Sequence, residues 1–139
     1  MSIEPAKRIF VALDTNDLSR GLDLARMLKG KVGGIKIGKE FFTANGPAGA
    51  KKIVAEGLPV FIDLKFHDIP NTVAGAIRAT ISLKPVILNV HAVGGRAMME
   101  AARTAASEES LFQGVERPLV LGVTVLTSLD EADLKDIGV

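Results

Sequence analysis

Residues 61–72 (FIDLKFHDIPNT) combine an apolar strand pattern with charged side chains that could carry out chemistry. Asp63, Lys65 and Asp68 form a D-x-K-x-x-D pattern, with His67 beside it. Burying a charge costs free energy unless the charge is paired or used. The stretch therefore predicts either a structural ion-pair network that includes Lys36, or a reactive site. Charges gathered at strand ends favour the reactive site.

Polar side chains also lie at or near the ends of the other apolar segments: Asp14, Lys36, His91, Thr124 and Thr127. Alternation along a strand places Asp63 and Lys65 on the same face. Lys36 is flanked by Gly34 and Gly38, which we expect to leave space beside it. Ligands bind at the carboxyl ends of parallel strands, so these side chains are predicted to form one site. His91 fits a structural histidine as well as a catalytic one, and His67 fits a structural role better.

Electrostatics narrows the chemistry of this site. Neighbouring carboxylates favour the protonated ammonium form of a lysine, whereas a Schiff-base nucleophile must lose its proton. Lys65 is therefore expected to donate a proton. A carboxylate beside an anionic substrate group repels it, and this repulsion vanishes if the group leaves as CO2. Decarboxylation followed by protonation of the carbanion meets these demands, and a class I aldolase is the nearest mechanistic rival.

Short apolar runs alternate with amphipathic ones along the chain. The predicted strands are 8–13, 34–37, 60–64, 86–90 and 119–125, and the predicted helices are 18–29, 47–56, 72–82 and 96–107. Asn16 or Asp17 is a candidate cap for the first helix, and Pro70 suits the turn before the third. Regular alternation of strands and helices predicts a single α/β domain, residues 1–139, with a parallel sheet.

Two architectures fit this pattern. An open five-stranded parallel sheet suits 139 residues, whereas a (β/α)8 barrel needs about 250 residues, so the chain would supply strands one to five of eight. Residues 130–139 look like a helix that stops almost as soon as it begins. A finished fold more often completes the element, so we expect a truncated barrel as readily as an open sheet.

Composition excludes several function classes. The net charge is +1, and the chain has no Tyr or Trp, which argues against a nucleic-acid-binding surface. Cysteine is absent, so thiolate nucleophiles and Cys-based zinc sites are excluded. No apolar run approaches the roughly 18 residues of a membrane span. We therefore expect a cytoplasmic protein that binds a small molecule.

The charged residues and their surroundings resemble the orotidine 5′-monophosphate decarboxylase family of the bacterial type. The resemblance runs from Ile9 to the last residue and rests on these segments: 12–14 (ALD), 36–42 (KIGKEFF), 63–72 (DLKFHDIPNT), 89–92 (NVHA) and 123–128 (VTVLTS). The D-x-K-x-x-D core alone is shared with metal-dependent sister decarboxylases. The continuation through 67–72, together with 36–40, is far more specific.

The resemblance implies cofactor-free and metal-free conversion of orotidine 5′-monophosphate to uridine 5′-monophosphate in pyrimidine biosynthesis. It implies that Lys65 protonates C6 and that Asp63 lies beside the departing carboxylate. It also implies that Lys36 and Asp14 hold the ribose and that Thr127 contacts the pyrimidine. The remaining implied site residues are His91, which would bind the substrate, and the pair Asp68 and Thr72. The last two would reach into the partner subunit's site, because the family builds its sites across a homodimer.

The chain also departs from the family, because the later strands normally bring the residues that hold the phosphate. We therefore expect the isolated chain to be unstable or inactive unless another segment completes the sheet. Two alternatives stay open: a magnesium-dependent sugar-phosphate decarboxylase or epimerase of the same barrel group, and a non-catalytic fragment that assembles with itself.

Overall fold

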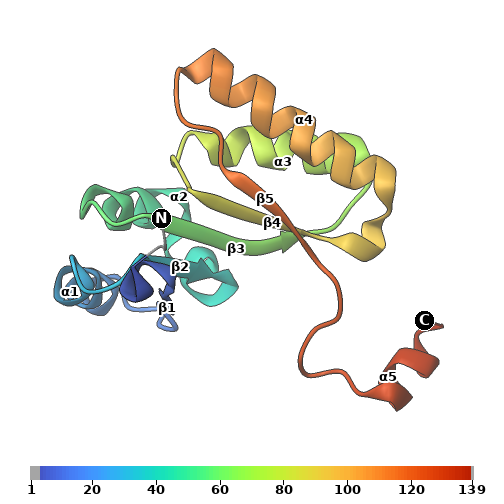
Figure 1. Ribbon diagram of the computed structural model, residues 1–139, viewed down its shortest axis with the longest axis horizontal. Coiled ribbons are helices and arrows are strands. Elements are labelled where there is room, and N and C mark those ends of the chain that lie inside the picture. The colour runs from blue at the N-terminus through green and yellow to red at the C-terminus, as the bar shows by residue number, and fades with distance from the viewer. Residues whose placement is uncertain (1–3, 139) are drawn as a thin grey trace.

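The computed structural model describes residues 4–138, in which parallel strands alternate with helices (Figure 1). The strands are β1 (Phe10–Ala12), β2 (Gly34–Gly38), β3 (Val60–Phe66), β4 (Ile87–His91) and β5 (Leu119–Val123). The helices are α1 (Leu18–Leu28), α2 (Lys39–Ala55), α3 (Pro70–Ile81), α4 (Arg96–Gln113) and α5 (Glu131–Asp136). Short 3-10 turns cover η1 (Pro5–Arg8) and η2 (Ala92–Gly94).

The five strands form one parallel sheet in the order β1-β2-β3-β4-β5. Strands that follow one another in the chain are therefore neighbours in the sheet. A doubly wound sheet reverses its strand order at a switch point, whereas a (β/α)8 barrel adds its strands in sequence. The predicted parallel α/β architecture is confirmed, and the strand order is that of the first five units of a barrel.

The two faces of the sheet differ in what covers them. One face packs against the helices through fully buried side chains: Ile35, Ile37, Val60, Ile62, Leu88 and Val90. α1 lies beside α2, and α3 lies beside α4 (Figure 1). The other face, here called the inner face, carries the register partners Lys36, Phe61, Ile87 and Leu119. Leu119 and Leu121 are 59% and 42% exposed there, so the inner face is open at β5.

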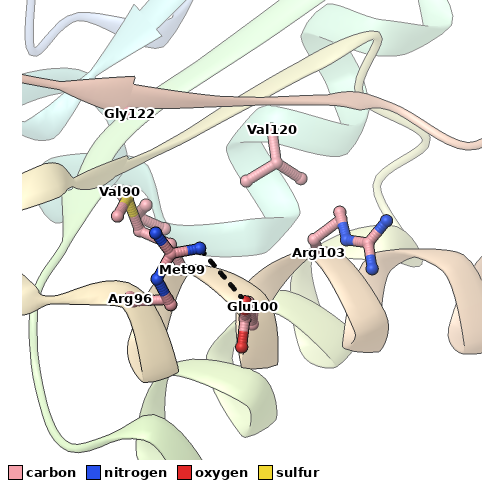
Figure 2. Close-up of a pocket in the computed structure, with 7 residues that line it drawn as sticks. All are labelled: Val90, Arg96, Met99, Glu100, Arg103, Val120 and Gly122. Carbon is pink, nitrogen blue, oxygen red and sulfur yellow. Dashed lines mark ion pairs between the residues drawn. The ribbon is translucent and has the colours of Figure 1, made fainter.

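The helix-bearing face is also open beyond β5. Figure 2 shows a groove between β5 and α4, about 340 Å³ in volume, with Val90, Met99 and Val120 among its lining side chains. Arg96 and Glu100 form an ion pair of 3.8 Å on the α4 side of it. A second hollow, of about 650 Å³, is lined by residues that include Phe10 of β1 and Leu119 of β5.

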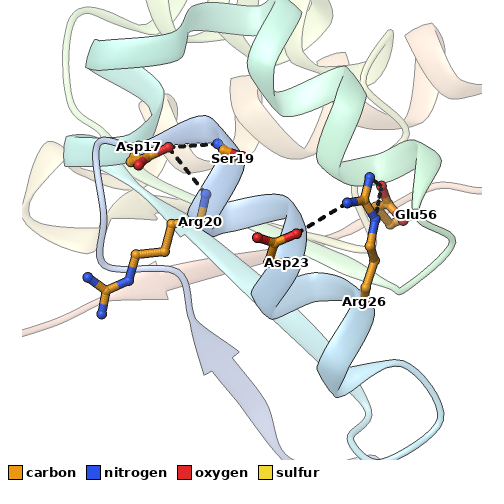
Figure 3. Close-up of polar contacts among 6 residues, drawn as sticks. All are labelled: Asp17, Ser19, Arg20, Asp23, Arg26 and Glu56. Carbon is orange, nitrogen blue, oxygen red and sulfur yellow. Dashed lines mark hydrogen bonds and ion pairs between the residues drawn. The ribbon is translucent and has the colours of Figure 1, made fainter.

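Local signals explain where the first helix begins and how it is held. Figure 3 shows the Asp17 carboxylate accepting hydrogen bonds from the backbone N–H groups of Ser19 (2.8 Å) and Arg20 (3.2 Å), which caps α1. Of the two predicted caps, Asp17 is therefore the one used. At the other end of α1, Arg26 donates to Glu56 just after α2 at 2.9 Å, which joins the two helices.

The predicted element boundaries differ from the structure in several places. α2 begins at Lys39 rather than Pro47, because a first helical stretch precedes Gly46, whose φ of 60° breaks the helical path. Pro70 opens α3 instead of preceding it, in the N-terminal position where a proline costs no hydrogen bond. α4 continues to Gln113, beyond the predicted end at residue 107. The short helix expected after residue 130 is confirmed as α5, and the chain beyond β5 extends away from the sheet (Figure 1).

One expectation about glycine is wrong. Gly34 does not leave room beside Lys36, because a Cβ there would overlap the Phe10 ring and the Pro59 carbonyl oxygen. Gly38 does fit the expectation, since a Cβ there would meet only the Lys36 ammonium nitrogen, at 3.6 Å.

This difference between glycines predicts opposite effects on stability. Gly34→Ala should lower the free energy of unfolding by roughly 1–3 kcal/mol, because it overpacks the β1–β2 pair. Gly75→Ala is the matched control: this α3 glycine has open space around it, so alanine should stabilise by about 0.5–1 kcal/mol. Urea denaturation followed by circular dichroism measures both changes. Equal effects of the two substitutions would contradict the packing described for Gly34.

Candidate active site

A carboxylate with cationic partners on both of its oxygens lies on the inner face of the sheet. Asp63 Oδ1 is 2.7 Å from the Lys65 Nζ atom, and Asp63 Oδ2 is 3.1 Å from the Lys36 Nζ atom. Asn89 Nδ2 donates a further hydrogen bond of 2.6 Å to Asp63 Oδ1. We call Lys36, Asp63, Lys65 and Asn89 the Asp63 cluster.

Strand register brings the Asp63 cluster together from β2, β3 and β4. Gly38 is the register partner of Asp63, and Lys36 lies two residues earlier on β2, on the same face. A Cβ at residue 38 would lie 3.6 Å from the Lys36 ammonium nitrogen, so a small residue there leaves Lys36 room to reach Asp63. On the opposite side of β3, Asn89 of β4 reaches Asp63 across the sheet.

The surroundings keep Asp63 ionised. Burial raises the pKa of the Asp63 carboxyl group, since its side chain is only 10% exposed, but hydrogen bonds from Lys65, Asn89 and Lys36 outweigh burial and hold its pKa below the ordinary value. The carboxylate is thus negative at neutral pH, between two ammonium groups. The lysine side chains are 26% exposed, so both ammonium groups remain accessible to a ligand.

His91 and His67 lie together beside this cluster. Their ring centroids are 5.6 Å apart, with the planes tilted by 51°. Burial lowers the pKa of His91, and the nearby His67, Lys39 and Lys65 lower it further. His91 is therefore an uncharged imidazole at neutral pH, suited to hydrogen bonding rather than to balancing a negative charge.

The other predicted site residues lie outside the Asp63 cluster: Asp14, Asp68, Thr72 and Thr127 are all exposed. Asp68 Oδ1 accepts a hydrogen bond from the backbone N–H of Ile69 at 2.7 Å. Within residues 4–138, no ion pair joins Asp68 to Lys36 or Lys65, so the expected four-membered charge network contains three of its members. Thr127 follows β5 by four residues.

The sequence reasoning did not select Asn89 as a site residue. A signal for it existed, because Asn89 interrupts the apolar residues of β4 on the same face as His91. An amide in the middle of a buried strand needs hydrogen-bond partners. Those partners turn out to be in β3.

No cluster of three or more metal-ligating side chains occurs within residues 4–138. In the same range, every helix is too short or too polar to cross a membrane. The two hollows described above do not include residues of the Asp63 cluster.

Comparisons with known proteins agree with the fold and with the motifs. Residues 7–138 match the model of the orotidine 5′-phosphate decarboxylase / HUMPS family. The orotidine 5′-phosphate decarboxylase of Rhodospirillum rubrum is 56% identical over 132 residues, covering 94% of this chain and 53% of that protein. The enzyme of the same name from Paramagnetospirillum magneticum is 50% identical over 130 residues, covering 94% and 55%.

Solved structures give the same result. The crystal structure of orotidine 5′-phosphate decarboxylase from Lactobacillus acidophilus aligns with a TM-score of 0.80 at 33% identity, over 93% of this chain and 58% of that one. An uncharacterized conserved protein from Geobacillus kaustophilus aligns with a TM-score of 0.79 at 38% identity, over 91% and 59%. The chain spans about half the length of the curated relatives it matches, and it belongs to the orotidine 5′-phosphate decarboxylase / HUMPS family.

Proposed function

We propose that this chain supplies the catalytic charges of an orotidine 5′-phosphate decarboxylase. The observation that carries the proposal is the pair of lysines on Asp63, at 2.7 Å and 3.1 Å, on the open inner face of the sheet. The bond from C6 of the pyrimidine to its carboxylate breaks, CO2 leaves, and the electron pair stays on C6. Lys65 then transfers an ammonium proton to C6 and is reprotonated from solvent.

In this proposal, electrostatic repulsion from Asp63 promotes loss of the substrate carboxylate. Its carboxylate would lie beside the substrate carboxylate, and repulsion between them disappears when neutral CO2 departs. The Lys65 ammonium group, held at the same place, stabilises the negative charge that develops on C6. Interactions that strengthen only in the transition state are those that raise the rate.

The remaining predicted residues are assigned to substrate binding. We propose that Lys36 and Asp14 hold the ribose, that Thr127 contacts the pyrimidine, and that His91 donates or accepts a hydrogen bond nearby. Asp68 and Thr72 are exposed, and within residues 4–138 neither forms an ion pair or hydrogen bond with the Asp63 cluster, which fits a role in the site of a partner subunit. We accordingly propose a homodimer that acts in the cytoplasm without a cofactor.

The matched family does not by itself exclude the alternative function, a magnesium-dependent sugar-phosphate decarboxylase or epimerase. In this chain both oxygens of Asp63 already have ammonium partners, which compete with a metal ion for the same lone pairs. This occupation favours the cofactor-free reaction. Orotidine 5′-phosphate decarboxylase activity that persists with excess chelator would support our choice, and activity that depends on added Mg²⁺ would support the alternative.

Turnover also requires residues that bind the part of the substrate away from the reacting carbon, including its phosphate. Binding energy from a remote group such as a phosphate can stabilise the transition state at the reacting carbon. The curated relatives extend well beyond the matched half, and Leu119 and Leu121 leave the inner face open at β5. We propose that full activity requires further strand–helix units to close the sheet.

The first test measures CO2 release from orotidine 5′-phosphate by this chain, alone and with the remaining half of the R. rubrum relative added as a separate chain. We expect little release by the chain alone and restored release by the completed barrel. Full activity of the isolated chain as a monomer would contradict the requirement for completion. Size-exclusion chromatography with circular dichroism on the same samples detects the alternative, a folded but inactive self-assembling fragment.

Lys65→Ala should lower the decarboxylation rate of the completed enzyme by roughly 10²–10⁴-fold, the usual contribution of a positioned general acid. Lys52→Ala removes an exposed lysine of α2 and is the matched control, with little expected effect. Steady-state kinetics with orotidine 5′-phosphate measures both. A Lys65→Ala enzyme that decarboxylates at the normal rate would rule out the proton-donor role.

The ionised state of Asp63 also predicts how stability depends on pH. Its folded pKa lies below the ordinary value of 3.8, so its contribution to stability is present above that pH and is lost as the pH falls through the folded pKa. Asp63→Asn should therefore be less stable than the parent at pH 7, because two partly buried ammonium groups lose their counter-charge. The difference should shrink below about pH 4.

Urea denaturation between pH 2 and pH 7 measures this difference. Asp23→Asn is the matched control, since the Asp23 side chain is 67% exposed and its pairing with Arg26 contributes little. A stability gap for Asp63→Asn that stays constant over the whole pH range would refute the paired, ionised state of Asp63.

A further inference from the structure

β3 does not run in regular register beside β4 at the Asp63 cluster. Ile62 pairs with Leu88, but the next pair is Phe66 with Val90. Three residues of β3, namely 63–65, therefore lie opposite the single residue Asn89 of β4. This is a β-bulge, and it interrupts the ladder of backbone hydrogen bonds at the residues that carry the charges.

The bulge forces an unusual backbone conformation on Lys65. Its φ is +51°, in the left-handed region that side chains other than glycine rarely adopt. Such a conformation persists only where the surrounding structure holds it in place. It also leaves the Lys65 N–H without the β4 carbonyl that a regular ladder would offer.

The Asn89 side chain fills the gap in the ladder with both ends of its amide. Asn89 Oδ1 accepts a hydrogen bond of 2.8 Å from the Lys65 N–H, and Asn89 Nδ2 donates the 2.6 Å bond to Asp63 Oδ1. The residue is 2% exposed, so water does not compete for these bonds. One rigid planar group thus connects the backbone of the lysine with the carboxylate that its ammonium group contacts.

An amide suits this position better than other side chains. The site needs one acceptor for an N–H and one donor for a carboxylate, and asparagine has one of each kind. An aspartate keeps the acceptor but places a second carboxylate against Asp63. A leucine has the same branched shape without polar atoms, so it leaves the Lys65 N–H without its acceptor and removes one of the donors to Asp63 Oδ1, which keeps only the Lys65 ammonium group.

We propose that Asn89 is a positioning residue: its amide holds the left-handed Lys65 backbone and the Asp63 carboxylate at the separation that the reaction needs. The proposal rests on the proposed function of this site. Asn89 does not itself contact the reacting carbon in this account. The charged groups that contact Asp63 are Lys36 from β2 and Lys65 from β3, and Asn89 is the neutral contact from β4.

Two variants test the acceptor and the donor of the Asn89 amide separately. Asn89→Leu removes both hydrogen bonds, so the Lys65 amide should exchange its hydrogen faster and the pKa of Asp63 should rise. Asn89→Asp should keep the Lys65 amide protected while raising the pKa of Asp63, because like charges repel. NMR hydrogen exchange and carboxyl titration of the full chain measure both. Thr80→Val is the control, since it removes a different, partly buried hydrogen bond, the 2.8 Å bond to Ala76 O in α3.

In the completed enzyme, Asn89→Leu should lower kcat by roughly 10²-fold with a smaller change in KM, the cost of misplacing a reacting group by about 1 Å. Asn89→Asp should move the acid limb of the kcat/KM profile to higher pH, which lost stability alone would not do. Thr80→Val should leave both parameters near the parent values.

The outcomes separate this inference from the proposed function. Unchanged Lys65 exchange and unchanged kcat in Asn89→Leu would overturn the positioning role, even in an active decarboxylase. If the completed parent enzyme does not decarboxylate, the proposed function fails, and the two NMR readouts still decide whether Asn89 holds Lys65 and Asp63. If Asn89→Leu does not fold, Asn89→Asp, which conserves shape, decides alone: an unshifted acid limb and an unshifted Asp63 pKa overturn the proposal.

Discussion

The arrangement of this site depends on one buried carboxylate that is shared by two ammonium groups. Asp63 lies where burial alone would favour its neutral form, and three hydrogen-bond donors reverse that preference. Removing Asp63 from this cluster would leave two partly buried ammonium groups without their counter-charge, which is costly. The strands that carry the partners, β2, β3 and β4, are therefore tied to one another by charge as well as by backbone hydrogen bonds.

The Asp63 cluster carries a net positive charge, and this charge suits an anionic ligand that loses one of its own negative groups during the reaction. Two ammonium groups outnumber one carboxylate, so in the proposed reaction an anionic substrate would be attracted as a whole, while the part of it beside Asp63 would be repelled. Loss of CO2 would relieve this local repulsion and leave the new negative charge next to an ammonium group. Attraction and repulsion would thus come from neighbouring groups, whose positions follow from the β2–β3 register and from the Asn89 hydrogen bonds at the β3 bulge.

Much of this was predictable from the sequence, and the exceptions have physical reasons. Strand alternation predicts that Asp63 and Lys65 share a face, and the spacing of apolar runs predicts the parallel sheet. The bulge at 63–65 could not be predicted, because the group that hydrogen-bonds to its backbone is the Asn89 side chain of another strand, 24 residues away from Lys65. The first turns of α2 were missed because Gly46 and Pro47 predict a helix start, yet here they form a kink within a longer helix. Gly34 was misjudged because its neighbour, the Phe10 ring, comes from β1.

The inner face links closure of the sheet to the electrostatics of the Asp63 cluster. Its polar groups gather towards the carboxyl ends of the strands, while Phe61, Ile87 and Leu119 form an apolar row one layer below. A sheet that closes on itself buries this row and lowers the dielectric constant around the charges above it, which strengthens every interaction in the Asp63 cluster. With Leu119 and Leu121 exposed and the two lysine side chains 26% exposed, water still reaches the ammonium groups. In the proposed enzyme, closure of the sheet would therefore add residues that bind the substrate and would also strengthen the electrostatic interactions of the residues already present.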